Sequence, residues 1–142
     1  MARLLALCLA VAALAGSTAA GAAAQQSLVE AAQRARAAWL AHDAAGLIGS
    51  SNSVVLQIPG ADPSSPLGAA QATELLRRYL RTAEERTVEV RRVREVEEGR
   101  GLVELERRYV VVGTSDVRRE TLFLGLRRGE RGWVLVELRT AP

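Results

Sequence analysis

The sequence predicts a single α+β domain in which helices come first and an antiparallel sheet follows, covered on one face by those helices. Three observations predict this fold. Apolar residues recur at helical spacing in much of the first half, they alternate with polar residues from Thr87 onward, and glycine-containing turns separate the alternating segments. Helices that precede tightly connected strands are typical of the α+β class. A length of 142 residues with 49% hydrophobic content suffices for one domain with a core.

The first segment has the layout of a secretory signal peptide. Arg3 precedes an apolar run at 4–14, and small residues follow the run. The run has only about half of the roughly 20 residues that a membrane-spanning helix needs, so a membrane anchor is the less favoured interpretation. We expect residues 1–24 to be removed before Gln25. Residues 25–142 would then form the mature domain, exported to a periplasm or to the extracellular space.

The cysteine and histidine content limits the chemistry of the mature domain. Cys8 is the only cysteine and lies in the apolar run, so the mature domain can form neither a disulfide nor a thiolate metal site. His42 is the only histidine, which excludes a metal centre with several imidazole ligands. We therefore expect no metal and no cofactor.

The first helix of the mature chain is expected from Leu28 to about Ala41. Ser27 is a suitable N-cap, and Glu30 three residues later completes a capping-box pattern. Trp39 falls on the apolar side of this helix.

The next elements are a short helix, a short strand and a second long helix. Asp43 can cap the short helix at 44–48. An apolar strand follows at 54–58 and ends at Pro59, after which a loop rich in proline, serine and aspartate leads to the long helix at 69–82.

The remainder of the chain is expected to form four strands joined by tight turns. Alternation of apolar and charged residues supports each strand, and glycines mark two of the turns. The strands are expected at 87–96, 102–113, 117–126 and 133–139, with turns at 97–101, 114–116 and 129–132.

Three stretches of this pattern resemble the nuclear transport factor two-like superfamily, also called the cystatin-like cone fold. They are AWLAHDAAGLIGS, which contains Trp39, then VVLQIPG followed by AAQATELLRRYL, and the closing hairpin LFLGLRRGERGWVLVELR. The similarity is greatest to small exported bacterial domains of unknown function. It implies a curved, cone-like sheet that wraps the Trp39 helix and leaves a pocket at its wide end. Members include isomerases, dehydratases and polyketide cyclases, but also binding and dimerisation modules, so the resemblance does not select a function.

Pairs of adjacent arginines, interleaved with glutamates, are the most unusual feature of the chain. Because neighbouring strand residues point to opposite faces, a pair within a strand sends one arginine to each side of the sheet. Cross-strand Arg–Glu pairs on a solvated face are the favoured interpretation, and an arginine-lined cavity for an anion is the alternative. Arg107 shares its face with Leu105 and Tyr109, so we expect it to point toward the helices, where its charge needs a partner or a ligand. The pairs lie at 77–78, 91–92, 107–108, 118–119 and 127–128.

No constellation of residues predicts catalysis. His42 can titrate near neutrality, but it stands at a helix-to-helix corner, where an exposed or capping role is favoured. Asp43 is better suited to N-capping than to acid–base chemistry. Nucleic acid is not an expected partner, because 16 acidic residues nearly balance the 19 basic ones and the aromatic content is only 4%.

The favoured function is an exported, non-catalytic module that binds a small apolar or anionic ligand, or a protein partner, in the pocket of the cone. One alternative is a homodimeric assembly module, although the expected outer face is charged. Another is an isomerase- or cyclase-like enzyme, which requires at least two of Asp43, His42 and Tyr109 to converge on one cavity. The residues expected to line the pocket are Trp39, Leu56, Tyr79, Arg107, Tyr109 and Trp133.

Overall fold

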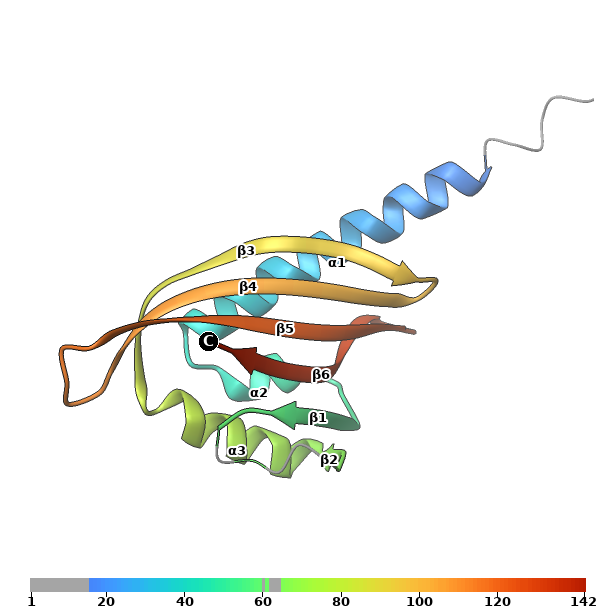
Figure 1. Ribbon diagram of the computed structural model, residues 1–142. Helices are drawn as coiled ribbons and strands as arrows, with labels where there is room; N and C mark the ends of the chain where they lie inside the picture. The colour runs from blue at the N-terminus through green and yellow to red at the C-terminus, as the bar shows by residue number, and fades with distance from the viewer. Residues whose placement is uncertain (1–15, 60, 62–64) are drawn as a thin grey trace, which may run out of the picture.

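A computed structural model describes residues 16–59, 61 and 65–142 of the chain. The apolar run at 4–14, on which the signal-peptide prediction depends, lies outside the described residues. Within them, three helices and six strands form one α+β domain, with the helices against the concave side of a curved sheet (Figure 1). The predicted fold class is therefore confirmed.

The strands form one mixed sheet in the order β2-β1-β6-β5-β4-β3. From β3 to β6 the chain runs as the expected antiparallel meander. The sheet differs from the predicted antiparallel arrangement at one place, because β1 pairs parallel with β6, with Leu56 opposite Leu138. This pairing joins segments that are far apart in the sequence, so no local pattern reports it. The strands are β1 (Ser53–Gln57), β2 (Leu67–Gly68), β3 (Ala83–Glu97), β4 (Arg100–Val111), β5 (Val117–Gly129) and β6 (Gly132–Ala141).

The first helix, α1 (Gly16–Leu40), begins earlier than expected. Ser27 lies inside the helix, so the predicted N-cap at this position is wrong; the Ser27 hydroxyl instead accepts a hydrogen bond from the indole of Trp133 (2.9 Å). The preceding alanine-rich sequence has high helix propensity and continues the helix toward the N-terminus. The first turns project beyond the sheet (Figure 1), and the first buried side chain among those described is Leu28. None of the described helices is both long and apolar enough to cross a membrane.

The other helices lie close to their predicted positions. In α2 (Ala44–Ile48) the Asp43 carboxylate accepts a hydrogen bond from the Gly46 amide (2.9 Å), which confirms the predicted N-cap. The helix α3 (Ala69–Leu80) ends two residues before its predicted end. The short strand β2 was not expected, and β3 begins at Ala83 rather than at Thr87.

The core lies between the three helices and the concave face of the sheet. Trp39 of α1 is fully buried there, together with leucines from α3, β4, β5 and β6. Leu28 packs so closely on β4 that a Cβ atom at Gly101 would come within 2.6 Å of its Cδ1. Glycine is needed at this position to let the helix approach the strand.

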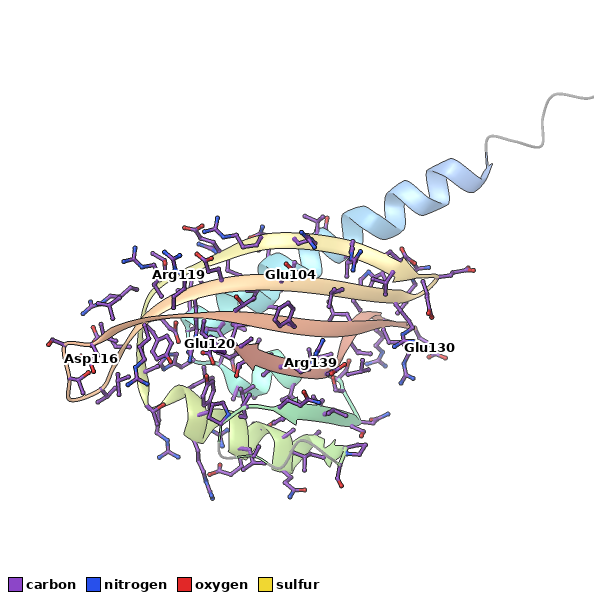
Figure 2. All side chains as sticks on the ribbon, viewed as in Figure 1. Glu104, Asp116, Arg119, Glu120, Glu130 and Arg139 are labelled. Atoms are coloured by element: carbon purple, nitrogen blue, oxygen red, sulfur yellow. The ribbon has the colours of Figure 1, made fainter. Side chains whose placement is uncertain are left out.

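The convex face of the sheet carries cross-strand ion pairs, as the favoured interpretation of the arginine pairs predicts. Arg91 on β3 contacts Glu106 on β4 at 2.8 Å, and the two side chains are solvent-accessible. In Figure 2, Glu104 and Arg119 lie along β4 and β5, while Asp116 and Glu130 mark the two ends of β5. Exposed pairs of this kind contribute little to stability.

Candidate functional site

Arg107 is the centre of a buried polar cluster on the concave side of the sheet. Its side chain is 1% exposed and points toward the helices, as the alternation along β4 predicts. Its Nε donates to Glu120 Oε2 (2.7 Å), Nη1 donates to Glu85 Oε1 (2.6 Å), and Nη2 donates to the Tyr79 hydroxyl (2.9 Å). The guanidinium is therefore paired within the protein by groups from α3, β3 and β5.

Aromatic rings enclose the same guanidinium. The Cζ atom of Arg107 lies 3.9 Å from the ring centre of Tyr109 and 5.1 Å from the ring centres of Trp39 and Tyr79. Cations are attracted to the faces of aromatic rings at such distances, and the attraction is stronger where water is excluded. The rings and the two carboxylates together stabilise a charge that would otherwise be costly to bury.

Glu85 is the second acid of the cluster, and its side chain is only 3% exposed. Its Oε1 accepts hydrogen bonds from the Trp39 indole (3.1 Å) and from Arg107, and the His42 Nε2 lies 3.7 Å away. In the part of the chain that the structure describes, Glu85 Oε2 is buried without a hydrogen-bond partner. With both carboxylates ionised, the cluster has one negative charge in excess.

A β-bulge explains why Glu85 points inward. Strict alternation along β3 would place Glu85 and Val88 on opposite faces, yet both side chains are buried. The register of β3 against β4 shifts between Glu85 and Thr87, and the inserted residue returns Val88 to the concave side. The sequence pattern alone could not show this, so Glu85 was not predicted as a site residue.

Glu120 was also not predicted, although the sequence contains a signal for it. Because side chains alternate along β5, Glu120 lies on the same face as Leu122 and Leu124, which are fully buried on the concave side. An acid in phase with buried leucines has to meet a partner, just as Arg107 does on the neighbouring strand. The register pairs Arg107 directly with Glu120.

Tyr79 connects Glu120 to Arg107 from α3. Its hydroxyl lies 2.6 and 2.7 Å from the two carboxylate oxygens of Glu120 and accepts from Arg107. Burial and the hydrogen bond to Glu120 raise the pKa of Tyr79 well above its usual range. Burial acts to lower the pKa of Arg107, but the facing Tyr79, Glu85 and Glu120 outweigh it and hold that pKa above its ordinary value. At neutral pH the tyrosine is thus a neutral donor and the arginine a cation.

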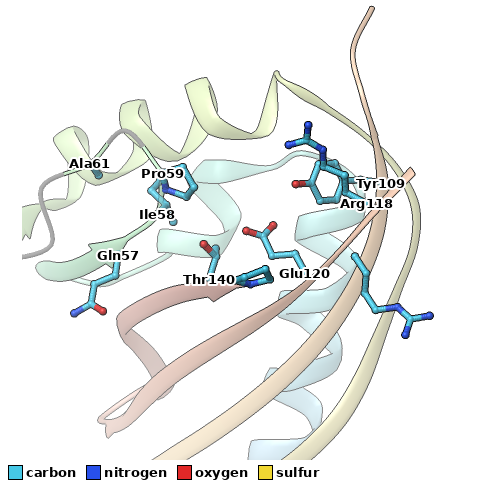
Figure 3. Close-up of a pocket in the computed structure, with 10 residues that line it drawn as sticks. Gln57, Ile58, Pro59, Ala61, Tyr109, Arg118, Glu120 and Thr140 are labelled. Carbon is cyan, nitrogen blue, oxygen red and sulfur yellow. The ribbon is translucent and has the colours of Figure 1, made fainter. Parts of the chain in front are cut away.

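An open pocket of about 640 Å³ lies next to this cluster (Figure 3). Glu120 faces into it near Thr140, and Arg118 lies beside Tyr109 at the same side of the pocket (Figure 3). Arg107 lies behind Glu120 and does not line the pocket. The lining residues are Gln57, Ile58, Pro59, Ala61, Tyr109, Arg118, Arg119, Glu120, Thr140 and Pro142.

The structure brings together only some of the residues that the sequence analysis proposed for the pocket. Trp39, Tyr79, Arg107 and Tyr109 meet in the buried cluster, and of these Tyr109 lines the 640 Å³ pocket. Tyr79 lines a neighbouring hollow of about 360 Å³, which shares residues 58, 59 and 61 with it.

The remaining two proposed residues lie elsewhere. Leu56 is buried in the core on β1. Trp133 stands at the start of β6, at the opposite end of that strand from Thr140, where its indole binds Ser27. Alternation along a strand predicts which face of the sheet Trp133 occupies. It does not predict how far along the cone Trp133 lies.

The acid–base candidates do not share a cavity. Asp43 caps α2, and Tyr109 lines the pocket beside Glu120. His42 was expected to be exposed or capping; it adopts a positive φ of 53° at the corner after α1, and its partly exposed ring approaches Glu85. The described residues also contain no group of three histidine, cysteine or acidic side chains placed to hold a metal ion.

Comparison with known proteins identifies the fold. No family model and no curated protein matches the chain. A ketosteroid isomerase-like protein from Erwinia carotovora atroseptica SCRI1043 matches with a TM-score of 0.67 at 18% identity, over 83% of this chain and 97% of that one. The chain has the cone fold of the nuclear transport factor two-like superfamily.

Other solved structures of the cone fold match over similar lengths. A nuclear transport factor two-like protein of unknown function from Shewanella oneidensis MR-1 has a TM-score of 0.59 at 10% identity, over 82% of this chain and 98% of that one. A domain of unknown function with a cystatin-like fold from Nostoc punctiforme PCC 73102 has a TM-score of 0.58 at 16% identity, over 83% and 76%. At these identities the likeness concerns the cone fold alone.

We expect Arg107→Leu to lower the free energy of unfolding by about 3–5 kcal/mol, because it leaves Glu85 and Glu120 buried without their cation. Urea unfolding followed by circular dichroism measures the change. Arg91→Leu is the matched control, since the Arg91–Glu106 pair on the convex face is exposed and its loss should have little effect. Equal effects of the two substitutions would contradict the central role of Arg107.

We expect the stability of the protein to fall as the pH rises above about 10, the pKa of an unfolded tyrosine. Because the pKa of Tyr79 is raised in the folded state, the folded chain keeps this proton where the unfolded chain loses it. The stabilisation is complete below that pH and is lost as the pH rises toward the folded pKa. Urea unfolding across this range should show a weaker decline for Tyr79→Phe, and an identical decline in both proteins would refute the assignment.

Proposed function

We propose that the mature chain is an exported, non-catalytic module that binds a small ligand in the pocket beside Glu120. The observation that carries this proposal is a carboxylate at the wall of an open pocket, held from behind by Arg107 and Tyr79. A polar group whose position is fixed before binding loses little conformational entropy when a ligand arrives.

The composition of the pocket supports a small molecule as the ligand. Ile58, Pro59 and the ring of Tyr109 provide apolar surface, while Glu120 and Thr140 provide polar groups among them. Apolar walls with a few placed polar groups are typical of small-molecule sites, and a volume of about 640 Å³ is within their usual range.

The contacts of Glu120 favour binding over catalysis. Its carboxylate oxygens already accept hydrogen bonds from Arg107 and from Tyr79. A carboxylate engaged in this way is well suited to orient a ligand, but a general base has to be free to take a proton from one. Neither His42 nor Asp43 reaches the pocket to act with it.

The surface gives less support to an assembly function. The large apolar side chains that are exposed among the described residues are scattered over α1, β3 and the β4–β5 hairpin, and are not gathered in one patch. The convex face carries ion pairs such as Arg91–Glu106 and Arg92–Glu104. Charged residues are depleted at the centre of stable interfaces.

Export is supported by the apolar run at 4–14 and the small residues that follow it. The described part of the fold is compatible with cleavage before Gln25, because Leu28 is the first buried side chain among those described in α1. Cleavage there would remove the projecting turns of the helix and leave its packed turns intact.

We expect the chain, expressed with its own N-terminus in a bacterium, to be recovered from the periplasm or the medium with a mass that begins at Gln25. Intact-mass spectrometry measures this. Ala24→Leu should block or move the cleavage, because the protease requires a small residue before the cut. Full-length chain retained in the cytoplasm would argue against export.

We expect Thr140→Phe to weaken ligand binding by about tenfold or more, because the ring fills space in the pocket that a ligand needs. Anilinonaphthalene sulfonate, an aromatic anion, serves as the probe, and its fluorescence reports binding. Thr121→Phe is the matched control, since Thr121 lies on β5 with its side chain on the convex face and opposite Glu106. Equal probe affinity in all three folded proteins would place the binding outside the pocket.

A further inference from the structure

Three charged residues of β5 line the pocket, and two of them, Glu120 and Arg118, differ in what they can still bind. Glu120 and Arg118 are two positions apart on one strand, so both side chains point to the concave side, with Cα atoms about 7 Å apart. Glu120 is buried against Arg107 and Tyr79, whereas Arg118 is exposed at the pocket's edge beside Tyr109 (Figure 3). Within residues 16–59, 61 and 65–142, Arg118 makes no ion pair, while Arg119 approaches Glu106 on the convex face (3.9 Å).

The inner end of the pocket requires a hydrogen-bond donor. An ionised carboxylate can only accept hydrogen bonds, and the oxygens of Glu120 are held at the wall by donors from behind. A methyl group against them would remove water from a charge without replacing its hydrogen bond. A ligand carboxylate there would face both Glu120 and the negative charge that Glu85 adds to the cluster, so an anionic group is excluded from this end.

The contacts of Glu120 favour a neutral donor over a cationic one. Arg107 is already bonded to Glu120 through Nε at 2.7 Å, so this carboxylate has a cationic partner before any ligand arrives, and the excess negative charge of the cluster lies with Glu85, which is 3% exposed and does not line the pocket. An ammonium group would meet the Arg107 guanidinium nearby and would have to lose its own water. A hydroxyl group donates to Glu120 without either cost.

The outer end of the pocket favours an anion, and the apolar walls favour an aliphatic chain. Arg118 offers a fork of donors that matches a carboxylate, and no described acid occupies it. Ile58, Pro59 and the ring of Tyr109 present apolar surface to the same pocket, with Ile58 and Pro59 across it from Arg118 (Figure 3). Glu120 thus specifies a hydrogen-bond donor, Arg118 specifies an anion, and the apolar surface specifies the aliphatic chain that carries both groups.

We propose that the pocket binds an aliphatic hydroxy acid, with its hydroxyl donated to Glu120 and its carboxylate bound by Arg118. The assignment rests on the proposed binding function and names the chemical class of its ligand. Arg118 and Glu120 are then the residues that determine specificity, and Arg107 is a positioning residue that fixes Glu120.

Titration calorimetry with a matched set of ligands tests the assignment without disturbing the Arg107 cluster. The set is 8-hydroxyoctanoate, octanoate, 1-octanol and 8-aminooctanoate, which share one chain and differ only at its ends. We expect 8-hydroxyoctanoate to bind at least about tenfold more tightly than octanoate, which leaves Glu120 without a donor. It should also bind more tightly than 1-octanol, which offers nothing to Arg118, and than 8-aminooctanoate.

Substituting one arginine on each side of the sheet separates the pocket from the convex face. Arg118→Gln should reduce the affinity for 8-hydroxyoctanoate to about that for 1-octanol and leave 1-octanol unchanged. Arg91→Gln is the matched control and should leave both affinities unchanged, because Arg91 pairs with Glu106 on the convex face and does not line the pocket.

Several results would overturn the assignment. Equal affinities for octanoate and 8-hydroxyoctanoate would show that Glu120 does not select a donor, and tighter binding of 8-aminooctanoate would show that it selects a cation. If none of the four ligands binds while anilinonaphthalene sulfonate does, and Thr140→Phe weakens that probe, the hydroxy-acid class is wrong and the pocket stands. If the probe fails as well, the proposed binding function fails with it.

Discussion

A charged guanidinium in a protein core has to be matched by acceptors, and in this cone fold the requirement falls on Arg107. Its acceptors come from separate elements: Tyr79 from α3, Glu85 from β3 and Glu120 from β5, while Trp39 of α1 packs against it. One side chain thus joins two helices to three strands. Apolar residues of similar volume could fill the same space, but they would leave the carboxylates without a fixed direction, which a planar guanidinium provides.

This cluster fixes the position of part of the pocket wall. Glu120 and Tyr109 belong to the cluster and also line the pocket of Figure 3, so the rigidity of the core extends to the pocket wall at these two residues. Arg118 differs in kind, because it is exposed and is positioned only by its strand. A pocket with one fixed end and one adaptable end can hold a ligand in a defined orientation and still admit it from solvent.

The sequence predicted those parts of the fold that depend on local periodicity. Alternation on β4 indicated that Arg107 faces the helices, and the same reasoning applied to β5 would have identified Glu120. Glu85 could not be found this way, because a bulge after it changes the phase of β3. Long-range placement was also hidden: no local pattern shows that β1 lies parallel to β6, or that Trp133 stands far from Tyr109 along the cone.

The parallel pairing of β1 with β6 has a consequence for how the chain acquires its structure. Residues 55–57 find their partners only at 137–139, so this part of the sheet cannot close until the last strand has been synthesised. Contacts of such large sequence separation form late and slowly, because a long loop has to be ordered first. The topology itself thus delays closure of the sheet until β6 is available.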